Sequence, residues 1–121
     1  MVHEVFETDL MEPREAARLY ADLATVPEMM APGGFEQRAK NAGFAIESID
    51  VVGSEWYEAS QEAGIAPNYM MQISRLRRAK DELLAELGEV AYRTMLGNAM
   101  WSIYLFIGKL ETRLYVLRLA A

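Results

Sequence analysis

The longest apolar stretch of the chain is residues 89–107, EVAYRTMLGNAMWSIYLFI. Drawn at the 3.6-residue period of an α-helix, its apolar side chains occupy most of the circumference and leave one narrow strip of small or polar residues: Arg93, Thr94, Gly97, Asn98 and Ser102. A membrane span needs about 20 consecutive apolar residues, and the uninterrupted run here, residues 99–107, is about half that length. The pattern predicts a buried helix of a globular domain with one small or polar seam, and no membrane span.

Three other stretches carry the β-branched and apolar residues that are typical of strands. They are residues 2–8, residues 44–52 with the sequence FAIESIDVV, and residues 113–119 with the sequence RLYVLRL. The last of these has the strongest strand pattern in the chain. The sequence therefore predicts three strands.

Helical patterns lie between these strands. Pro13 suits a first helical turn, and apolar residues then recur at helical spacing to about residue 25. A second helix, residues 34–42, ends at Gly43, where a left-handed residue is favoured. Residues 68–87 predict one long helix, and residues 53–67 predict no more than a short helical turn.

The order of these elements predicts a mixed α/β fold in a single domain. A strand-helix-strand core would comprise residues 1–52 and 112–121, and residues 53–111 would form a helical lid inserted between them. The 121 residues include no cysteine and carry a formal charge of −6, which argues against binding to nucleic acid because phosphate contacts need clustered Lys and Arg. The amino-terminal residues have neither a basic nor an apolar leader pattern, so we expect a cytoplasmic protein.

Three sequence marks, in order along the chain, resemble a known family. They are Ala-Gly-Phe at residues 42–44, Gly-Ser-Glu-Trp at residues 53–56, and the block of residues 101–119. Together they resemble the carboxyl-terminal part of a class I S-adenosylmethionine-dependent methyltransferase of the bacterial small-molecule type. The resemblance implies a truncated Rossmann-like sheet of about three strands, in which the last strand runs antiparallel between the other two and the helical lid covers their carboxyl ends.

The chain departs from that family in the part that binds the cofactor. It has no strand, glycine-rich turn and helix in succession, and Gly33-Gly34 follows proline and methionines as a loop break would. The resemblance implies methyl transfer from S-adenosylmethionine to a small apolar or aromatic acceptor, yet we expect the isolated chain not to bind that cofactor. Three explanations stay open: one part of a divided methyltransferase, a repurposed ligand-binding protein or cofactor-free catalyst, and a structural half that dimerises.

The predicted sheet has an exposed edge. A three-stranded piece of a larger sheet leaves residues 2–8 without a strand on one side, and exposed apolar edges pair with other chains. We therefore expect either a homodimer or a complex with a complementary methyltransferase half, joined through this edge or through the lid helices.

Five residues are candidates for binding a substrate: Glu55, Trp56, Asn98, Trp101 and Tyr104. The first two follow a strand end, where a carboxylate beside aromatic rings suits a polar ring, and the other three lie in or beside the small or polar seam. Packing is the competing interpretation for all three aromatic residues, and Asn98 would then only satisfy a neighbouring helix. Neighbouring Glu58 is expected to be exposed. No catalytic residue is assigned.

The remaining features favour ordinary structural roles. His3 is the only histidine, so no metal site is expected. The methionine pairs at residues 29–30 and 70–71 are more typical of core filler than of an adaptable ligand lining. A basic cluster on the predicted long helix favours a solvated face with ion pairs over an anion site, because acidic residues follow it: Arg75, Arg77, Arg78, Lys80, then Asp81, Glu82 and Glu86.

Overall fold

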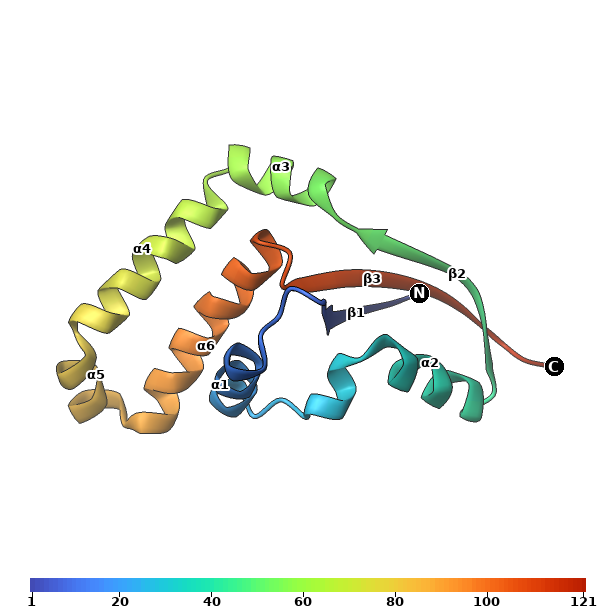
Figure 1. Ribbon diagram of the computed structural model, residues 1–121, viewed down its shortest axis with the longest axis horizontal. Helices are drawn as coiled ribbons and strands as arrows, with labels where there is room; N and C mark the ends of the chain where they lie inside the picture. Colours follow the sequence, from blue (N-terminus) through green and yellow to red (C-terminus); the bar gives the residue numbers. More distant parts are fainter.

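The computed structural model describes the backbone of residues 1–121 and every side chain except that of Ser54. Its one sheet has the strand order β1-β3-β2, formed by β1 (Val2–Glu7), β2 (Phe44–Val52) and β3 (Leu110–Leu119) (Figure 1). The central strand β3 runs antiparallel to both neighbours, so β1 and β2 point the same way. The mixed α/β fold and the insertion of the last strand between the other two are therefore confirmed.

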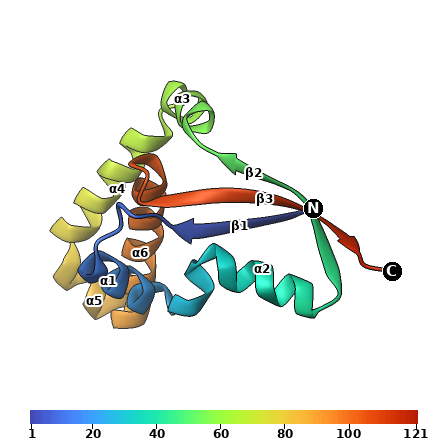
Figure 2. The same ribbon diagram turned by 45° about the vertical axis from the view of Figure 1, so that its right-hand side comes forward.

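Most helices gather beyond the carboxyl ends of β1 and β2, and one lies along a face of the sheet (Figures 1 and 2). The helix along the sheet is α2 (Pro32–Asn41), which follows the short 3₁₀ helix η1 (Pro27–Met30). The helices at the end of the sheet are α1 (Pro13–Leu23), α3 (Ser54–Glu62), α4 (Ile65–Arg78), α5 (Lys80–Leu87) and α6 (Glu89–Phe106). Helix α6 is central to this group, because α1, α4 and α5 all pack against it.

The sheet is buried mainly on the face that α2 covers. Alternation along the strands places Phe6 and Tyr115 on this face, and both are fully buried. Phe35 of α2 packs against them, with its ring centroid 4.7 Å from that of Tyr115 and 6.2 Å from that of Phe6. This aromatic cluster attaches α2 to the sheet and leaves the opposite face to form part of a cavity.

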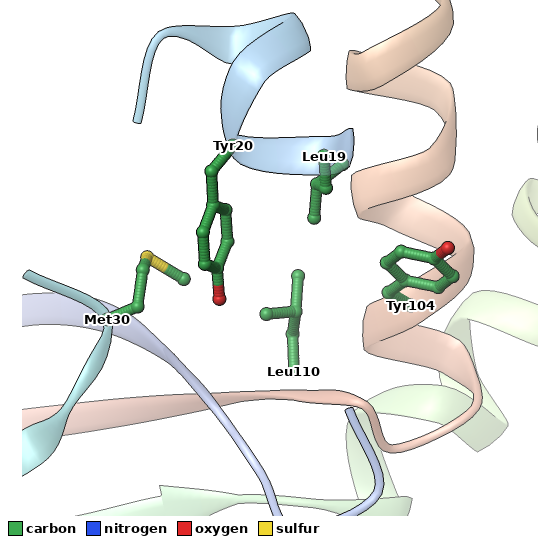
Figure 3. Close-up of a cluster of buried hydrophobic side chains, with 5 residues drawn as sticks. All are labelled: Leu19, Tyr20, Met30, Tyr104 and Leu110. Carbon is green, nitrogen blue, oxygen red and sulfur yellow. The ribbon is translucent and has the colours of Figure 1, made fainter. Parts of the chain in front are cut away.

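A second core cluster joins the helical end to the sheet. It contains Leu19 and Tyr20 from α1, Met30 from η1, Tyr104 from α6 and Leu110 from β3 (Figure 3). The Tyr20 hydroxyl donates a hydrogen bond of 2.6 Å to the carboxylate of Glu7 at the end of β1. Burial, and then this carboxylate, raises the pKa of Tyr20, so the hydroxyl stays protonated and the contact persists at neutral pH.

Helices α1 and α6 approach most closely at Gly97. A Cβ atom at this position would lie 2.9 Å from Leu23 Cδ2 and 3.1 Å from Asp22 Cβ, so only glycine lets the two helices cross here without a shift. Beside this contact Arg93 donates a hydrogen bond of 2.8 Å to Asp22. Two members of the predicted small or polar seam, Gly97 and Arg93, therefore face α1.

The prediction that α6 is buried on nearly all sides is wrong for its outer surface. Val90 is 80% exposed, Met95 and Asn98 are also exposed, and so is Ile107, which directly follows the helix. The reason is tertiary: the helix stands at the end of a sheet with only three strands, so its neighbours cover only part of its circumference. The helix therefore has more apolar side chains than its neighbours in this chain can bury.

The predicted long helix over residues 68–87 is two helices. The chain turns at Ala79, where φ is −94° and ψ is 19°, and α5 then packs against α6. Alanine and its basic neighbours are good helix formers, so the local sequence has no sign of this break. The segment after β2 also holds more helix than predicted, because α3 extends over Ser54–Glu62 and α4 begins at Ile65 with Pro67 in its first turn.

Two predictions about side chains of η1, α4 and α5 are wrong in part. Met30 is buried, but Met29, Met70 and Met71 are exposed, so the methionine pairs are not core filler as a group. The basic cluster that begins at Arg75 is exposed to solvent, as predicted, but among the described side chains it forms no ion pair with the acidic residues of α5. The turn at Ala79 explains this difference, since it removes the one-turn spacing that such pairs need.

Candidate functional site

The apolar face of the sheet that α2 does not cover forms one wall of a cavity of about 390 Å³. We call it the tryptophan groove, because both tryptophans of the chain line it. The indole N–H groups, His3 and Thr112 are the polar parts of a lining that is otherwise apolar. The residues around it are His3, Val5, Val52, Trp56, Trp101, Leu105, Thr112 and Leu114.

Strand register explains how residues far apart in the sequence form the floor of this groove. Val5 of β1 is opposite Thr112 of β3, and Val52 of β2 is opposite the same threonine from the other side. Side chains two residues apart share a face, so His3 and Leu114 extend the same surface. The floor therefore crosses all three strands near the carboxyl ends of β1 and β2.

The helices supply the two indoles that border the groove. Trp101 is followed one helical turn later by Leu105 on α6, and Trp56 comes from α3. The ring centroid of Trp56 lies 5.4 Å from that of Phe106 and 5.3 Å from that of Tyr57. These contacts hold Trp56 in place while 40% of the residue stays exposed, an arrangement suited to stacking with a flat molecule.

A second cavity, of about 400 Å³, lies between α1, α4 and α6. We call it the arginine pocket, and its lining residues are Arg14, Glu15, Arg18, Arg77, Met100 and Tyr104. A smaller recess of about 40 Å³ adjoins it through four shared residues and adds Leu19, Asp22 and Leu96. No strand residue lines this cavity. Its lining is mostly charged, whereas the lining of the tryptophan groove is mostly apolar.

The carboxylates near the arginine pocket already have partners. Glu15 forms an ion pair with Lys109, and the hydrogen bond from this lysine is the main reason that the pKa of Glu15 is lowered. Asp22 accepts a hydrogen bond from Arg93. Among the described side chains, Arg18 and Arg77 form no ion pair. The pocket therefore keeps an excess of positive charge in a chain whose formal charge is −6.

The predicted substrate-binding residues fall in three different places. Trp56 and Trp101 meet in the tryptophan groove, and Tyr104 lines the arginine pocket. Glu55 and Asn98 are exposed and line neither cavity. The buried amide that the seam implied is thus not present at Asn98, because this side chain is exposed to solvent. Glu58 is exposed, as predicted.

Sequence reasoning missed Arg14, Arg18 and Arg77 as lining residues of one cavity. Arg14 and Arg18 are one helical turn apart on α1, and that spacing is visible in the sequence. Their proximity to Arg77 of α4 depends on the way both helices pack around α6, and no local pattern reports this.

The described residues do not form an S-adenosylmethionine cradle. Gly33 and Gly34 lie in the first turn of α2, after η1, whereas a nucleotide cradle sits between a strand and a helix. Gly53 does lie between a strand and a helix, β2 and α3, but as a single glycine and not as a glycine-rich turn. A Cβ at Gly34 would meet the Glu28 carbonyl oxygen and the Arg38 side chain at 3.2 Å, so this glycine serves local packing. No cluster of three or more metal-binding side chains occurs in the part of the chain that the structure describes.

The sequence matches no protein-family model and has no significant similarity to a curated protein. Within the described residues, no helix is both long enough and apolar enough to cross a membrane.

Proposed function

We propose that this chain is the substrate-side part of a cytoplasmic S-adenosylmethionine-dependent small-molecule methyltransferase, with the cofactor held by a half that lies outside these 121 residues. The observation that carries the proposal is the strand order, in which antiparallel β3 lies between β1 and β2 and the helices stand at the carboxyl ends of those two strands. Open α/β sheets bind ligands at this end. The same strand order is what the family resemblance implies.

In this proposal the tryptophan groove binds the methyl acceptor. Its volume of about 390 Å³ falls within the usual range of small-molecule sites, and two indoles with an apolar floor suit a flat apolar or aromatic compound. The residues of this chain position the acceptor and exclude water from it. The methyl-transfer step itself belongs to the cofactor half, and no residue here is assigned to it.

The cofactor half would attach at the free edge of β1. This strand is hydrogen-bonded to β3 on one side only, so its other edge can accept a further strand. A homodimer through the same edge is the competing arrangement. Sedimentation velocity over a range of concentrations tests both, and a monomer at every concentration, alone and with the candidate partner, would contradict association through this edge.

Titration calorimetry with S-adenosylmethionine tests the proposal directly. We expect no heat of binding from the chain alone, and saturable binding once it is copurified with a polypeptide, encoded beside it, that carries a strand, a glycine-rich turn and a helix. Binding of the cofactor by the isolated chain would overturn the division into two halves. Absence of any such neighbouring sequence would also count against it.

Fluorescence provides a separate test of the acceptor site, because both tryptophans of the chain line the groove. Titration with orcinol, a small uncharged phenol, should change the indole emission in a saturable way. Trp56→Ala and Trp101→Ala should each weaken binding by about tenfold, the equivalent of about 1.4 kcal/mol. Phe44→Ala removes an exposed aromatic ring outside the groove and should leave the affinity within about twofold.

A second candidate function is a small-ligand-binding protein or cofactor-free catalyst that uses the same groove. One observation favours it: the groove is formed entirely by residues of this chain. In that case the isolated chain would bind orcinol with an affinity that no partner changes, and no partner would confer S-adenosylmethionine binding. Partner-dependent orcinol affinity would instead support the methyltransferase proposal.

A further inference from the structure

The arginine pocket has no role in the proposed function, and its composition is unusual for this chain. It draws Arg14 and Arg18 from α1 and Arg77 from α4 around one cavity of about 400 Å³. We propose that this pocket binds the oxyanion group of a small organic acid, either a carboxylate or a phosphate ester. This inference does not depend on a cofactor half, because every lining residue belongs to this chain.

The charge balance of the pocket is the first argument. Glu15 is the one carboxylate that lines the main cavity, and its ion pair with Lys109 directs it to another cation. Arg14 pairs with Glu12 at 3.1 Å, but both side chains are largely exposed, so solvent screens this contact. Arg18 and Arg77 border one cavity without an ion-pair partner among the described side chains, so the cavity keeps a positive charge that favours an anion.

The guanidinium groups of the pocket indicate which kind of anion it binds. A guanidinium group presents a planar fork of N–H donors that matches the paired oxygens of carboxylates and phosphates. Two such groups, on Arg18 and Arg77, lie on different helices and can contact one anion from two sides. The pocket therefore favours an oxyanion over a halide or another spherical ion.

Tyr104 adds a neutral donor to the same cavity. The residue is only 8% exposed, and its hydroxyl points away from Leu19 and Leu110 of the core cluster (Figure 3). Burial, and then Glu15, raises the pKa of this hydroxyl, while the charges of Lys109, Arg18 and Arg77 act in the opposite direction. The hydroxyl is thus protonated at neutral pH, and Tyr104 lines the same cavity as both arginines.

Apart from Asp22 of the recess, which is paired with Arg93, the rest of the lining is apolar, and this narrows the ligand class further. Met100 borders the main cavity and, with Leu96 and Leu19, the adjoining recess. A methionine can adapt its shape to a flat or irregular group. The arrangement fits an acid with an apolar body better than inorganic phosphate alone.

Titration followed by NMR tests the proposal, with benzoate and phenyl phosphate as probes at constant ionic strength. Both probes should shift the signals of Tyr104 and Met100 saturably, and the tighter of the two identifies the carboxylate or the phosphate ester as the preferred group. The double variant R18Q/R77Q should weaken binding by at least about tenfold. The exposed positions of both arginines make a folding defect avoidable, and an unchanged melting temperature will verify this.

A matched control separates a specific site from general charge. R75Q/R78Q removes the same two charges from α4 at exposed positions beside Met70 and Met71, outside the arginine pocket, and should change the affinity by less than about twofold. Tyr104→Phe removes only a hydroxyl and should weaken binding a few-fold, about 1 kcal/mol or less for one neutral donor. Orcinol binding in the tryptophan groove should be unaffected by R18Q/R77Q, so failure here is distinguishable from failure of the proposed function.

Three results would overturn the inference. The first is the absence of saturable shifts at Tyr104 and Met100 with both probes. The second is an equal loss of affinity in R18Q/R77Q and R75Q/R78Q, which would show that the overall charge governs the interaction. The third is full retention of binding in R18Q/R77Q.

Discussion

The tryptophan groove and the arginine pocket are nearly equal in volume, at about 390 Å³ and 400 Å³, yet they are opposite in chemistry. Both use α6. Trp101 and Leu105 form one row of its side chains, and Leu96, Met100 and Tyr104 form the next row, turned by about 100°. One helix can therefore separate an apolar site from a charged one, provided that a sheet lies against one row and basic helices lie against the other.

The two cavities also differ in what holds them open. Strand alternation forms the floor of the groove, so hydrogen-bonded backbone fixes the shape of that floor. Helix packing alone forms the arginine pocket, and this depends on the close approach of α1 and α6 at Gly97. The groove should accordingly tolerate changes in helix packing that disrupt the pocket.

The largest effect is expected from a substitution that removes the core support shared by both cavities. Leu110 is fully buried in the core cluster, and Met100, Trp101 and Leu105 pack against this cluster. Leu110→Ala should lower the free energy of unfolding by about 2–5 kcal/mol and weaken binding of both orcinol and phenyl phosphate. Chemical denaturation measures the first effect. The control Leu10→Ala, at an exposed position, should cost about 0.5 kcal/mol or less.

A substitution with a smaller effect on stability should weaken binding in one cavity and not in the other. Gly97→Val places side-chain atoms against Leu23 and Asp22 and pushes α1 away from α6. We expect a loss of about 1–3 kcal/mol in unfolding free energy from this overpacking. Phenyl phosphate binding should fall sharply and orcinol binding should persist. Gly33→Val, where a Cβ meets open space, is the matched control. Equal loss at both cavities would refute their independence.

The ion pair between Lys109 and Glu15 should make the stability difference between wild type and Lys109→Met depend on pH. Because this lysine lowers the pKa of Glu15 from its ordinary value of 4.5, the pair stabilises the fold fully above pH 4.5, and its contribution is lost as the pH falls through the lowered value. Wild type should therefore exceed Lys109→Met in stability near neutral pH, and the difference should shrink in acid. Denaturation followed by circular dichroism across this range measures it. A difference independent of pH would contradict the assignment.

The same variant also bears on the arginine pocket. Without Lys109, Glu15 becomes free to pair with Arg14 or Arg18, so phenyl phosphate should bind about two- to threefold more weakly at neutral pH. Orcinol binding should not change, because neither residue lines the groove.

The smallest effects are expected at the two predicted site residues that line neither cavity. Glu55→Gln and Asn98→Ala change exposed side chains, so both probes should bind within about twofold of wild type. The same fluorescence and NMR titrations measure this. A tenfold loss of orcinol affinity in Glu55→Gln would extend the acceptor site beyond the groove as defined here.

Local sequence patterns were sufficient to predict the features that depend only on residues near one another in the sequence. The bounds of β2 agree with the predicted strand at residues 44–52, and Gly43 adopts the left-handed backbone that its position at the helix end requires, with φ of 85°. The predicted position of β3 between β1 and β2 is confirmed. Two of the five candidate residues, Trp56 and Trp101, share one cavity.

The sequence by itself determined the alternation of strands and helices, because hydrophobic periodicity and glycine positions act over a few residues. Only the tertiary structure decided the turn at Ala79, the exposure of the outer side of α6 and the meeting of Arg18 with Arg77 around one pocket. Each of these depends on how many neighbours an element has and on which side they pack. Such contacts join residues far apart in the chain, and no local pattern records them.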